Sequence, residues 1–369
     1  MAFGNLSGAP GRALVLVGFM GSGKSSAART LVSGSLDSDS LIESQTGSTV
    51  NDLFASEGEA RFREIEEQVV LAALERSGNG VGRGVISLGG GALGSARVRE
   101  ALKSHTVVLL DLDVDECWER VRGSSRPLAT DRAKFGDLYE SRRASYSAVA
   151  DAVVPADGVH VVRQALPAIE MLTRSPQGTR LVWAVTASGA YPVFVGEDLI
   201  GAEFLRPEGR FALITDTNVG AIHGSNFSDP MVRIAIEPGE AAKNISSLAG
   251  VWSKLAQAGL TRDDQVFALG GGVVGDLAGF AAASYQRGIP VSQFPTTLVA
   301  QVDSALGGKT GVDLPEGKNY VGAYHQPSAV IADTATLQTL PREEMSAGMA
   351  EVIKTALISG GPLWDMVSS

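Results

Sequence analysis

The chain has 369 residues, enough for two or three domains with separate cores, and its 44% hydrophobic and 20% charged composition is typical of folded proteins. The net charge of −10 argues against a nucleic-acid or anionic-membrane surface, since either would favour basic residues. The single cysteine, Cys117, excludes an internal disulfide framework, and no apolar run is long enough for a signal core or a membrane span. We therefore expect a cytoplasmic protein.

Short apolar runs alternate with helical patterns from residue 14 onward, as in parallel βαβ units. The runs ALVLVG, GVISLGGG and TVVLLDLD predict buried strands. Residues 59–78 predict a helix with one packed face, flanked by Arg63 and Glu66. These elements form a predicted first domain over residues 1–172. Cys117 lies in a helical pattern of this domain, which favours a packed thiol over a nucleophile.

Residues 173–180, TRSPQGTR, are rich in turn formers and are predicted to be a linker. New strands are then predicted at LVWAVTA, YPVFVG, FALITD and VFALGGG, which places a second α/β domain over residues 181–340. The tail over residues 341–369 has a helical pattern and is too short to be a domain by itself.

The segment LVLVGFMGSGKSS contains Gly18, four further residues, and then Gly23, Lys24 and Ser25. This spacing between a strand and a helix is that of a phosphate-binding loop. Backbone N–H groups of such a loop face phosphate oxygens, its lysine supplies charge, and its serine hydroxyl can bind Mg²⁺. The first domain is therefore predicted to bind a nucleoside triphosphate.

Two carboxylates, Asp37 and Asp39, follow in the segment DSDSLIE. In an extended segment, residues two apart point to the same side, so one carboxylate can lie over a metal while the other binds or deprotonates a hydroxyl. A helix cap or an Asx turn explains such a pair equally well.

The motifs GEARFREIE, SLGGGA, SRPLA and ESRRASY follow in this order, and with the loop they span roughly residues 12–172. This order resembles the shikimate kinase family. The resemblance implies a phosphate-loop fold, with a parallel sheet covered by helices on both faces, and transfer of a phosphoryl group from ATP to shikimate. It implies that shikimate is bound by Asp39, Arg63, Gly90 and Arg142.

The same resemblance implies that Ser25 and, through water, Asp37 bind Mg²⁺. The implied catalytic residues are Lys24, Asp39 and Arg126, the last of them in a mobile lid. The implied ATP-binding residues are Gly21, Ser22, Gly23, Lys24, Ser25, Ser26 and Arg126. One departure is that Lys24 and Asp37 are 13 positions apart, about four fewer than we expect in this family. Such a shortening can tilt the two aspartates relative to the loop and slow turnover, because phosphoryl transfer depends on positioning.

A second glycine-rich turn occurs in VFALGGGVVGDLAGF, where no lysine follows the glycines. Strand, glycines and helix in this order favour a turn that binds a dinucleotide through its bare backbone. The segments FPTTLVAQVDSALGGKTGVD, GKNYVGAYHQP and GMAEVIK follow. Together they resemble 3-dehydroquinate synthase over about residues 181–360. This resemblance implies a Rossmann-like NAD-binding domain followed by the beginning of an incomplete helical domain over residues 341–369.

The synthase family converts DAHP, a phosphorylated sugar acid, into 3-dehydroquinate with release of phosphate, using NAD and zinc. The resemblance implies DAHP binding by Arg287, Asp303, Asn319 and Lys354, with Lys309 and Lys354 as catalytic residues. Arg287 would reach the site of a neighbouring subunit, which implies a homodimer through this part. The implied NAD-binding residues are Asp216, Asn218, Gly239, Glu240, Lys243, Gly272, Val273, Val274, Gly275, Asp276, Thr296, Thr297, Lys309 and Lys318. Pro238, the first residue of the segment PGE, stands where we expect an acidic residue, which weakens one NAD contact.

Glu351 and Lys354 lie three residues apart, so they share one helix face. They can form an ordinary surface ion pair, whereas the resemblance makes Glu351 a zinc ligand. A catalytic zinc needs about three protein ligands. The chain's four histidines, His105, His160, His223 and His325, all precede Glu351 and none lies in an HxxxH or HExxH pattern. We therefore expect an incomplete zinc site and doubt synthase activity in this chain.

The best reading of the sequence is a shikimate kinase fused to part of a 3-dehydroquinate synthase, with ATP, Mg²⁺, NAD and zinc as cofactors. Its expected partners are small-molecule substrates, without nucleic acid or membrane. The alternative is a kinase of another small polyol, fused to a module that binds NAD or forms dimers without catalysis.

Overall fold

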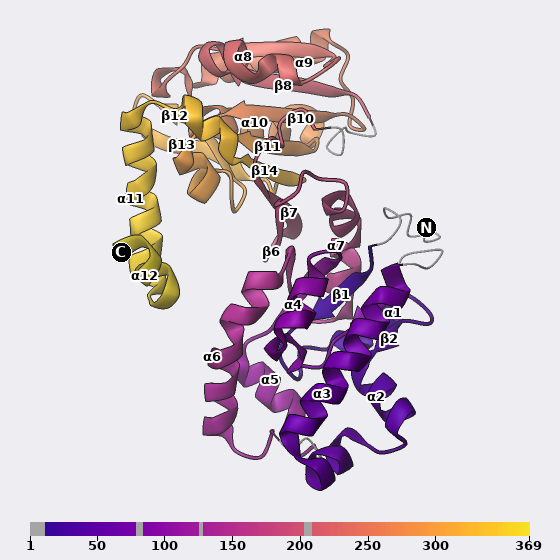
Figure 1. The fold of residues 1–369 in the computed structure, drawn as a ribbon. Helices are drawn as coiled ribbons and strands as arrows, with labels where there is room; N and C mark the ends of the chain where they lie inside the picture. Colours follow the sequence, from indigo (N-terminus) through magenta and orange to yellow (C-terminus); the bar gives the residue numbers. More distant parts are fainter. Residues whose placement is uncertain (1–11, 79–83, 125–127, 203–208) are drawn as a thin grey trace. The chain divides into compact units, whose positions relative to one another are not determined.

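The computed structural model describes residues 12–78, 84–124, 128–202 and 209–369 (Figure 1). Their contacts divide the chain into two compact units. Unit 1 comprises Met1–Arg174 and Arg180–Trp183, and unit 2 comprises Ser175–Thr179 and Ala184–Ser369. Every helix within the described ranges is too short or too polar to cross a lipid bilayer.

Unit 1 is built on a parallel sheet. Its strands, in spatial order, are β2 (Leu36–Asp37), β3 (Val85–Ser87), β1 (Leu14–Val17), β4 (Thr106–Asp111), β5 (Ala152–Pro155) and the first residues of β6 (Arg180–Thr186). Strand β1 is buried along its whole length, because a central parallel strand is covered on both faces. The three apolar runs predicted as strands in this unit are therefore confirmed.

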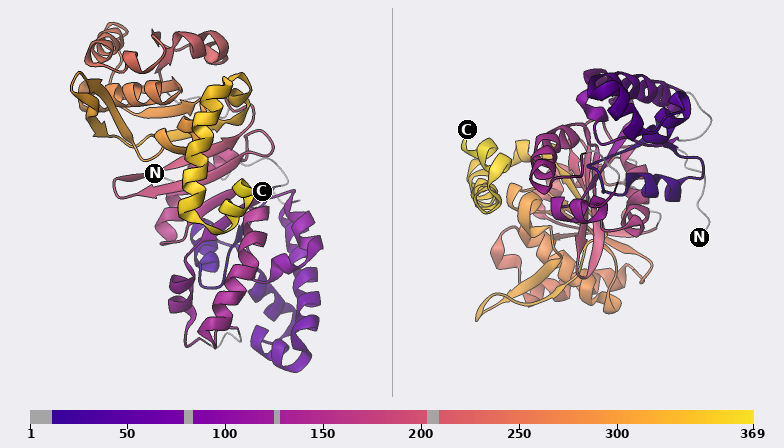
Figure 2. Two further views of the ribbon diagram at one scale, coloured as in Figure 1. Left: turned by 90° about the vertical axis from the view of Figure 1, so that its left-hand side faces the viewer. Right: turned by 90° about the horizontal axis from the view of Figure 1, so that it is seen from below.

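The helices of unit 1 lie between these strands in the chain (Figures 1 and 2). They are α1 (Lys24–Leu31), α2 (Ser38–Thr46), α3 (Val50–Gly78), α4 (Ala96–Leu102), α5 (Val114–Val121), α6 (Arg132–Val149) and α7 (Val159–Leu172), with a short 3₁₀ turn η1 (Ala92–Gly94) before α4. Helix α1 has 8 residues and strand β2 only 2, which is where the short spacing between Lys24 and Asp37 is accommodated. Adjacent strands β1 and β3 each end in a glycine-rich loop, so the two loops meet at one edge of the sheet.

The strands of unit 2 also run parallel to one another, and the apolar runs YPVFVG, FALITD and VFALGGG form strands as predicted. The strands, in spatial order, are β7 (Gly189–Gly196), β14 (Ala329–Asp333), β11 (Val291–Pro295), β10 (Gln265–Gly270), β8 (Phe211–Asp216) and β9 (Val232–Ile236). An antiparallel hairpin, β12 (Lys309–Leu314) and β13 (Gly317–Tyr324), forms a separate small sheet.

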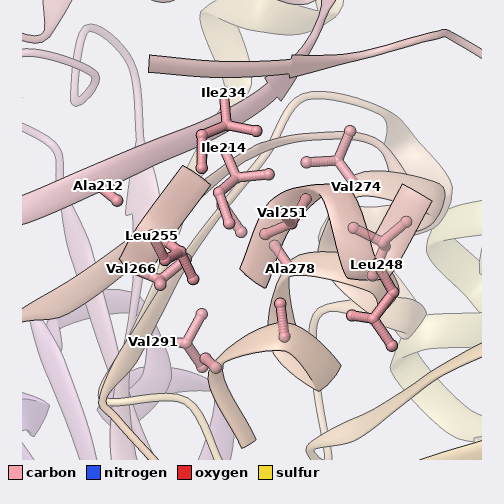
Figure 3. Close-up of a cluster of buried hydrophobic side chains, with 14 of the residues drawn as sticks. Ala212, Ile214, Ile234, Leu248, Val251, Leu255, Val266, Val274, Ala278 and Val291 are labelled. Atoms are coloured by element: carbon pink, nitrogen blue, oxygen red, sulfur yellow. The ribbon is translucent and has the colours of Figure 1, made fainter. Parts of the chain in front are cut away.

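The core of unit 2 lies where α9 (Ile245–Gln257) and α10 (Gly272–Ser284) pack on this sheet (Figure 3). Ile214 from β8 and Val266 from β10 meet Leu248 and Val251 of α9, and all four are almost completely buried. The remaining elements are α8 (Thr217–His223), the short turns η3 (Gly224–Asn226), η4 (Glu240–Ala242), η5 (Tyr285–Arg287) and η7 (Thr334–Thr339), the π-helical turn η6 (Ala300–Ser304), and the last two helices α11 (Arg342–Ser359) and α12 (Gly361–Ser368).

Candidate functional sites

The loop between β1 and α1 has the backbone geometry of an anion-binding loop. Gly18, Gly21 and Gly23 all have positive φ angles, of 145°, 89° and 83°. A Cβ atom on Gly18 would lie 2.6 Å from the Leu110 carbonyl oxygen, and one on Gly21 would lie 2.7 Å from that of Cys117. Only glycine allows this close approach. The N-cap residue of α1 is Gly23, which has no side chain, so the N terminus of the helix has no side-chain cap.

A cavity of about 540 Å³ lies over this loop. Lys24 is buried at its floor, where its Nζ donates a hydrogen bond to the Phe19 carbonyl oxygen over 2.9 Å. The Ser22 hydroxyl is also buried and has no hydrogen-bond partner in the described part of the chain. All predicted ATP-binding residues from Gly21 to Ser26 line this cavity, together with Asp37 and Asp39. Arg126 lies outside the described residues.

Asp37 and Asp39 do not share an extended segment, so that expectation is wrong. Helix α2 begins at Ser38, and Asp37 is its N-cap residue, whose Oδ1 accepts from the Ser40 N–H over 3.3 Å. Asp39 lies in the first turn of the helix. The hydrogen bond from the Ser40 N–H to the Asp37 side chain therefore favours a capped helix over the extended conformation. The short segment between Lys24 and Asp37 nevertheless brings both carboxylates to the cavity over the loop.

A second cavity, of about 460 Å³, adjoins the first. Ser25, Asp37, Asp39, Gly89 and Gly90 line both of them. The predicted shikimate-binding residues line this second cavity without exception: Asp39, Arg63, Gly90 and Arg142. The sequence motifs that carry them are thus brought together in space.

The two arginines of the second cavity are held by different contacts. The Arg63 guanidinium donates to Glu66 over 2.6 Å and to Glu59 over 3.1 Å, and it lies over the ring of Phe62 at 5.3 Å. Arg142 on α6 donates from Nη1 to the Gly90 carbonyl oxygen over 3.0 Å. Paired guanidinium groups at one end of a cavity suit a ligand carboxylate, which accepts several charge-assisted hydrogen bonds.

Glu66 does not flank the packed face of α3 as expected, since it is only 3% exposed. Burial raises the pKa of its carboxyl above the ordinary value, although Arg63 opposes that shift. Because Glu66 and Arg63 lie three apart on one helix, their pairing was accessible from the sequence. Tyr146, one turn after Arg142, and Arg120, which lines the cavity over the loop, are further residues that the sequence analysis missed.

The glycine-rich turn of unit 2 lies at the N terminus of α10. Gly271 is the N-cap residue and supplies no side-chain cap. A Cβ atom on Gly271 would lie 2.9 Å from Cγ2 of Thr297, and one on Gly272 would lie 3.0 Å from Oγ of Ser304. The Thr296 hydroxyl is buried and has no hydrogen-bond partner among the described residues. Bare backbone beside an unsatisfied hydroxyl fits the expected approach of a dinucleotide.

Lys243 lies at the centre of a cluster of acidic and amide groups. It is only 4% exposed, and its Nζ lies 3.2 Å from Asp276, 3.1 Å from Glu240 and 2.9 Å from Oδ1 of Asn319. Burial alone lowers the pKa of Lys243, but Asp276 and Glu240 outweigh burial and raise it. The lysine is therefore a permanent cation that holds together residues from three separate elements.

A cavity of about 470 Å³ lies beside this cluster. Predicted NAD-binding and DAHP-binding residues meet there, because its lining includes Asp276, Asp303, Lys309 and Asn319. Asp303 is carried by the π-helical turn η6, a distortion that often re-aims side chains at functional sites.

Other predicted residues of unit 2 lie away from the lining of this cavity. Asp216 caps α8 by accepting from the N–H groups of Asn218 and Val219 over 2.9 and 2.8 Å. Lys318 is largely exposed and lies 3.3 Å from Glu240. Arg287 is exposed with φ of 67°, and Gly239 has φ of 92°. The remaining predicted residues, Val273, Val274 and Gly275, lie in the first turns of α10.

Glu351 and Lys354 form an ion pair with each other on α11. Within the described ranges, no group of three or more histidine, cysteine, aspartate or glutamate residues has the arrangement of a metal site. The residues present therefore do not fit a complete zinc centre around Glu351.

Unit 1 has the features of a phosphate-loop protein with an arginine-lined pocket beside the loop, and unit 2 those of an α/β dinucleotide-binding domain. Residues 20–172 match the family model of shikimate kinase, and residues 233–347 match that of the 3-dehydroquinate synthase N-terminal region. The chain therefore contains a region that matches the shikimate kinase family, followed by a region that matches the amino-terminal part of the 3-dehydroquinate synthase family.

Individual relatives agree with this assignment. The 3-dehydroquinate synthase of Symbiobacterium thermophilum is 53% identical over 181 residues, which are 46% of this chain and 51% of the relative. That of Caulobacter vibrioides is 48% identical over 182 residues, 46% of this chain and 49% of the relative. The chain thus spans about half the length of the synthases that it matches.

Two solved structures are similar to parts of this chain. A shikimate kinase from Acinetobacter baumannii in complex with shikimate is 32% identical, with a TM-score of 0.39, over 43% of this chain and 92% of that one. A 2-deoxy-scyllo-inosose synthase complexed with carbaglucose-6-phosphate, NAD⁺ and Co²⁺ is 30% identical, with a TM-score of 0.44, over 47% of this chain and 50% of that one.

Proposed function

We propose that unit 1 phosphorylates shikimate with ATP to give shikimate 3-phosphate. The observation that carries this proposal is the pair of adjoining cavities, one over the phosphate loop and one lined by Arg63 and Arg142, with Asp39 lining both. A phosphoryl donor in the first cavity and a hydroxylated carboxylate in the second would meet at that aspartate.

The residues divide the chemistry between them. Arg63 and Arg142 bind the carboxylate of the acceptor and so orient its ring. Asp39 orients the attacking hydroxyl and accepts its proton as the oxygen–phosphorus bond forms, while ADP leaves. Lys24 and the loop N–H groups stabilise charge on the transferred phosphoryl group. The Ser25 hydroxyl and Asp37 offer the hard oxygen ligands that Mg²⁺ prefers, and Arg126 stays a prediction for the phosphates.

The kinase proposal is tested by measuring ADP release with shikimate and with other hydroxylated acids such as gluconate. Asp39→Asn is expected to lower kcat by about 100-fold or more, because a positioned general base is removed. Asp131→Asn is a matched control, since Asp131 caps α6 through the Lys134 N–H and lines neither cavity. ADP release with gluconate but not with shikimate would remove shikimate as the substrate.

We further propose that unit 2 binds NAD at the turn Gly270–Gly272, beside a cavity that is suited to DAHP. The unsatisfied Thr296 hydroxyl and the close approach of Gly271 to Thr297 support this. Conversion of DAHP to 3-dehydroquinate by the family requires metal ligands in addition to Glu351, and we assign no metal-dependent step to the described residues.

NAD binding is measured by isothermal titration calorimetry. Gly271→Ala is expected to weaken it by roughly tenfold or more, since the added Cβ would lie 2.9 Å from Cγ2 of Thr297 and displace the turn that the pyrophosphate approaches. Gly250→Ala on the exposed side of α9, where a Cβ atom meets nothing within 4 Å, provides the control. Equal NAD affinity in both variants would exclude this turn as the binding site.

We also propose a homodimer through unit 2 and a cytoplasmic location. Arg287 supports the first, because it is exposed and lies outside the lining of the cavity beside Asp276. Tyr285 and Gln286 both donate to the Leu260 carbonyl oxygen over 3.0 Å, which fixes the turn that presents Arg287. The free, buried thiol of Cys117 agrees with a reducing compartment. Sedimentation equilibrium and cell fractionation test these two statements.

A further inference from the structure

The carbonyl oxygen of Gly90 accepts two hydrogen bonds from helix α6. One comes from Nη1 of Arg142 over 3.0 Å, and the other from the hydroxyl of Tyr146 over 2.5 Å. These donors are four residues apart, so they lie on one face of the helix. Arg142 has a proposed role with the ligand, whereas Tyr146 has none so far.

Tyr146 contacts the Gly90–Gly91 peptide but is absent from the lining of the arginine-lined cavity. Both glycines line that cavity and also a separate cavity of about 780 Å³, and Arg142 reaches both. Tyr146 lines only the larger cavity. The peptide therefore borders the ligand cavity and also contacts the tyrosine that holds it.

The hydrogen bond to the carbonyl also fixes the N–H group of the same peptide. The described part of the chain has no cis peptide bond, and in a trans peptide the Gly91 N–H points opposite to the Gly90 carbonyl. It thus points away from Tyr146. No hydrogen bond within the described residues occupies this N–H group.

We propose that Tyr146 is a positioning residue of the kinase site, which holds the Gly90–Gly91 peptide so that its N–H group is offered to the carboxylate of the ligand. The inference rests on the proposed kinase function. Arg142 uses only Nη1 for the Gly90 carbonyl, so its other N–H groups stay available for a carboxylate. Tyr146 supplies the second donor to that carbonyl and so restrains the orientation of the peptide when the side chain of Arg142 adjusts to the ligand.

The hydroxyl is suited to this task over the whole neutral pH range. Tyr146 is only 5% exposed. Burial raises the pKa of its phenol to about 12, with Arg142 opposing the shift. The group therefore remains a donor wherever the enzyme would work.

Tyr146→Phe tests the proposal, with Tyr139→Phe as a matched control. Tyr139 lies on the same helix, donates to the Leu112 carbonyl oxygen over 3.0 Å, and has a pKa likewise raised to about 12. In Tyr146→Phe the KM for shikimate is expected to rise roughly tenfold, because the Gly90 carbonyl loses one of the two donors that orient its peptide. The KM for ATP and kcat are expected to stay within about twofold of wild type, as are all three constants in Tyr139→Phe.

A neutral analogue sharpens the comparison. With a hydroxymethyl group in place of the shikimate carboxylate, wild type and Tyr146→Phe are expected to have KM values within about twofold of each other. A general loss of structure would instead raise the KM for ATP, for shikimate and for the analogue together, and that result would overturn the proposal.

Hydrogen exchange of the ligand-free protein gives a readout that does not depend on the substrate. The peptide spanning residues 88–95 is expected to exchange faster in Tyr146→Phe and unchanged in Tyr139→Phe. Unchanged exchange in both variants overturns the positioning role, whatever the kinetics. Failure of wild type to phosphorylate shikimate removes the proposed function instead, and the exchange measurement still decides whether Tyr146 fixes the peptide.

Discussion

At the scale of single residues, Glu66 is held almost out of solvent against Arg63. Its raised pKa means that the unfolded chain releases this proton at lower pH than the folded chain does. Between the ordinary carboxyl pKa and the raised one, the folded state binds more protons, so stability falls as pH rises.

We predict that Glu66→Gln removes this part of the pH dependence. The difference in free energy of unfolding, wild type minus variant, should decrease from about pH 4 to pH 7. Urea titrations at several pH values measure it. Glu67→Gln is the control, and its pH dependence is expected to have the opposite sign. The Ser95 hydroxyl and Arg97 lower the pKa of Glu67, so the stability that Glu67 contributes is lost as pH falls. A difference that increases with pH for Glu66→Gln would contradict the prediction.

Lys243 gives a second prediction at this scale. Lys243→Met leaves Asp276 without its cation and Glu240 with only the exposed Lys318, and burial already raises the pKa of Asp276. We expect a loss of about 2 kcal/mol in stability, below the ~3–5 kcal/mol typical of fully buried pairs because Glu240 is partly exposed. Lys309→Met, on an exposed side chain of the neighbouring cavity, is expected to change stability by less than about 0.5 kcal/mol. Denaturant unfolding followed by tryptophan fluorescence distinguishes them.

At the scale of elements, the hairpin β12–β13 depends on two glycines that bring its strands together. A Cβ atom on Gly322 would lie 2.0 Å from the Thr310 carbonyl oxygen, and one on Gly311 would lie 2.7 Å from that of Val321. The hairpin carries Lys309 and Asn319, so its geometry places two residues of the cavity.

Gly322→Ala is therefore predicted to separate the two strands and to weaken NAD binding by roughly tenfold, since an overpacked backbone contact cannot relax cheaply. Gly250→Ala in α9 is predicted to raise the free energy of unfolding by about 0.5–1 kcal/mol, because no atom lies within 4 Å of the new methyl group. Calorimetric titration and urea unfolding of both variants check this. Unchanged NAD affinity in Gly322→Ala would show that the hairpin does not position the cavity residues.

The elements were predictable where one physical signal dominates. Apolar runs located the central strands, because strands that are buried on both faces consist almost entirely of apolar residues. Asp39 was assigned to an extended segment because a strand and a capped helix compete within three residues, and the Asp37 cap decides between them. The π-helical turn that carries Asp303 had no local signal in the sequence. Its Ala305 N–H donates to the Ala300 carbonyl oxygen, and Gln301 within it donates to the carbonyl oxygens of Pro295 and Asp333.

At the scale of the whole molecule, the two compact units have separate predicted ligands. A ligand that binds only the folded form stabilises it by RT ln(1 + [L]/Kd). We predict that ATP with Mg²⁺ raises the unfolding temperature of unit 1 alone, and that NAD raises that of unit 2 alone. Differential scanning calorimetry with each ligand measures this, and a transition raised equally by both ligands would argue against independent sites.

Cys117 gives this molecule a built-in reporter. It is the sole cysteine of the chain, it is completely buried on α5, and burial raises its thiol pKa to about 11. A thiol reagent can therefore modify this protein at a single residue, Cys117 in unit 1. The reaction requires that unit 1 opens and exposes the thiol. The labelling rate of the intact chain therefore measures the opening of the unit that holds the phosphate loop. Opening of unit 2 does not contribute to that rate, because unit 2 contains no cysteine.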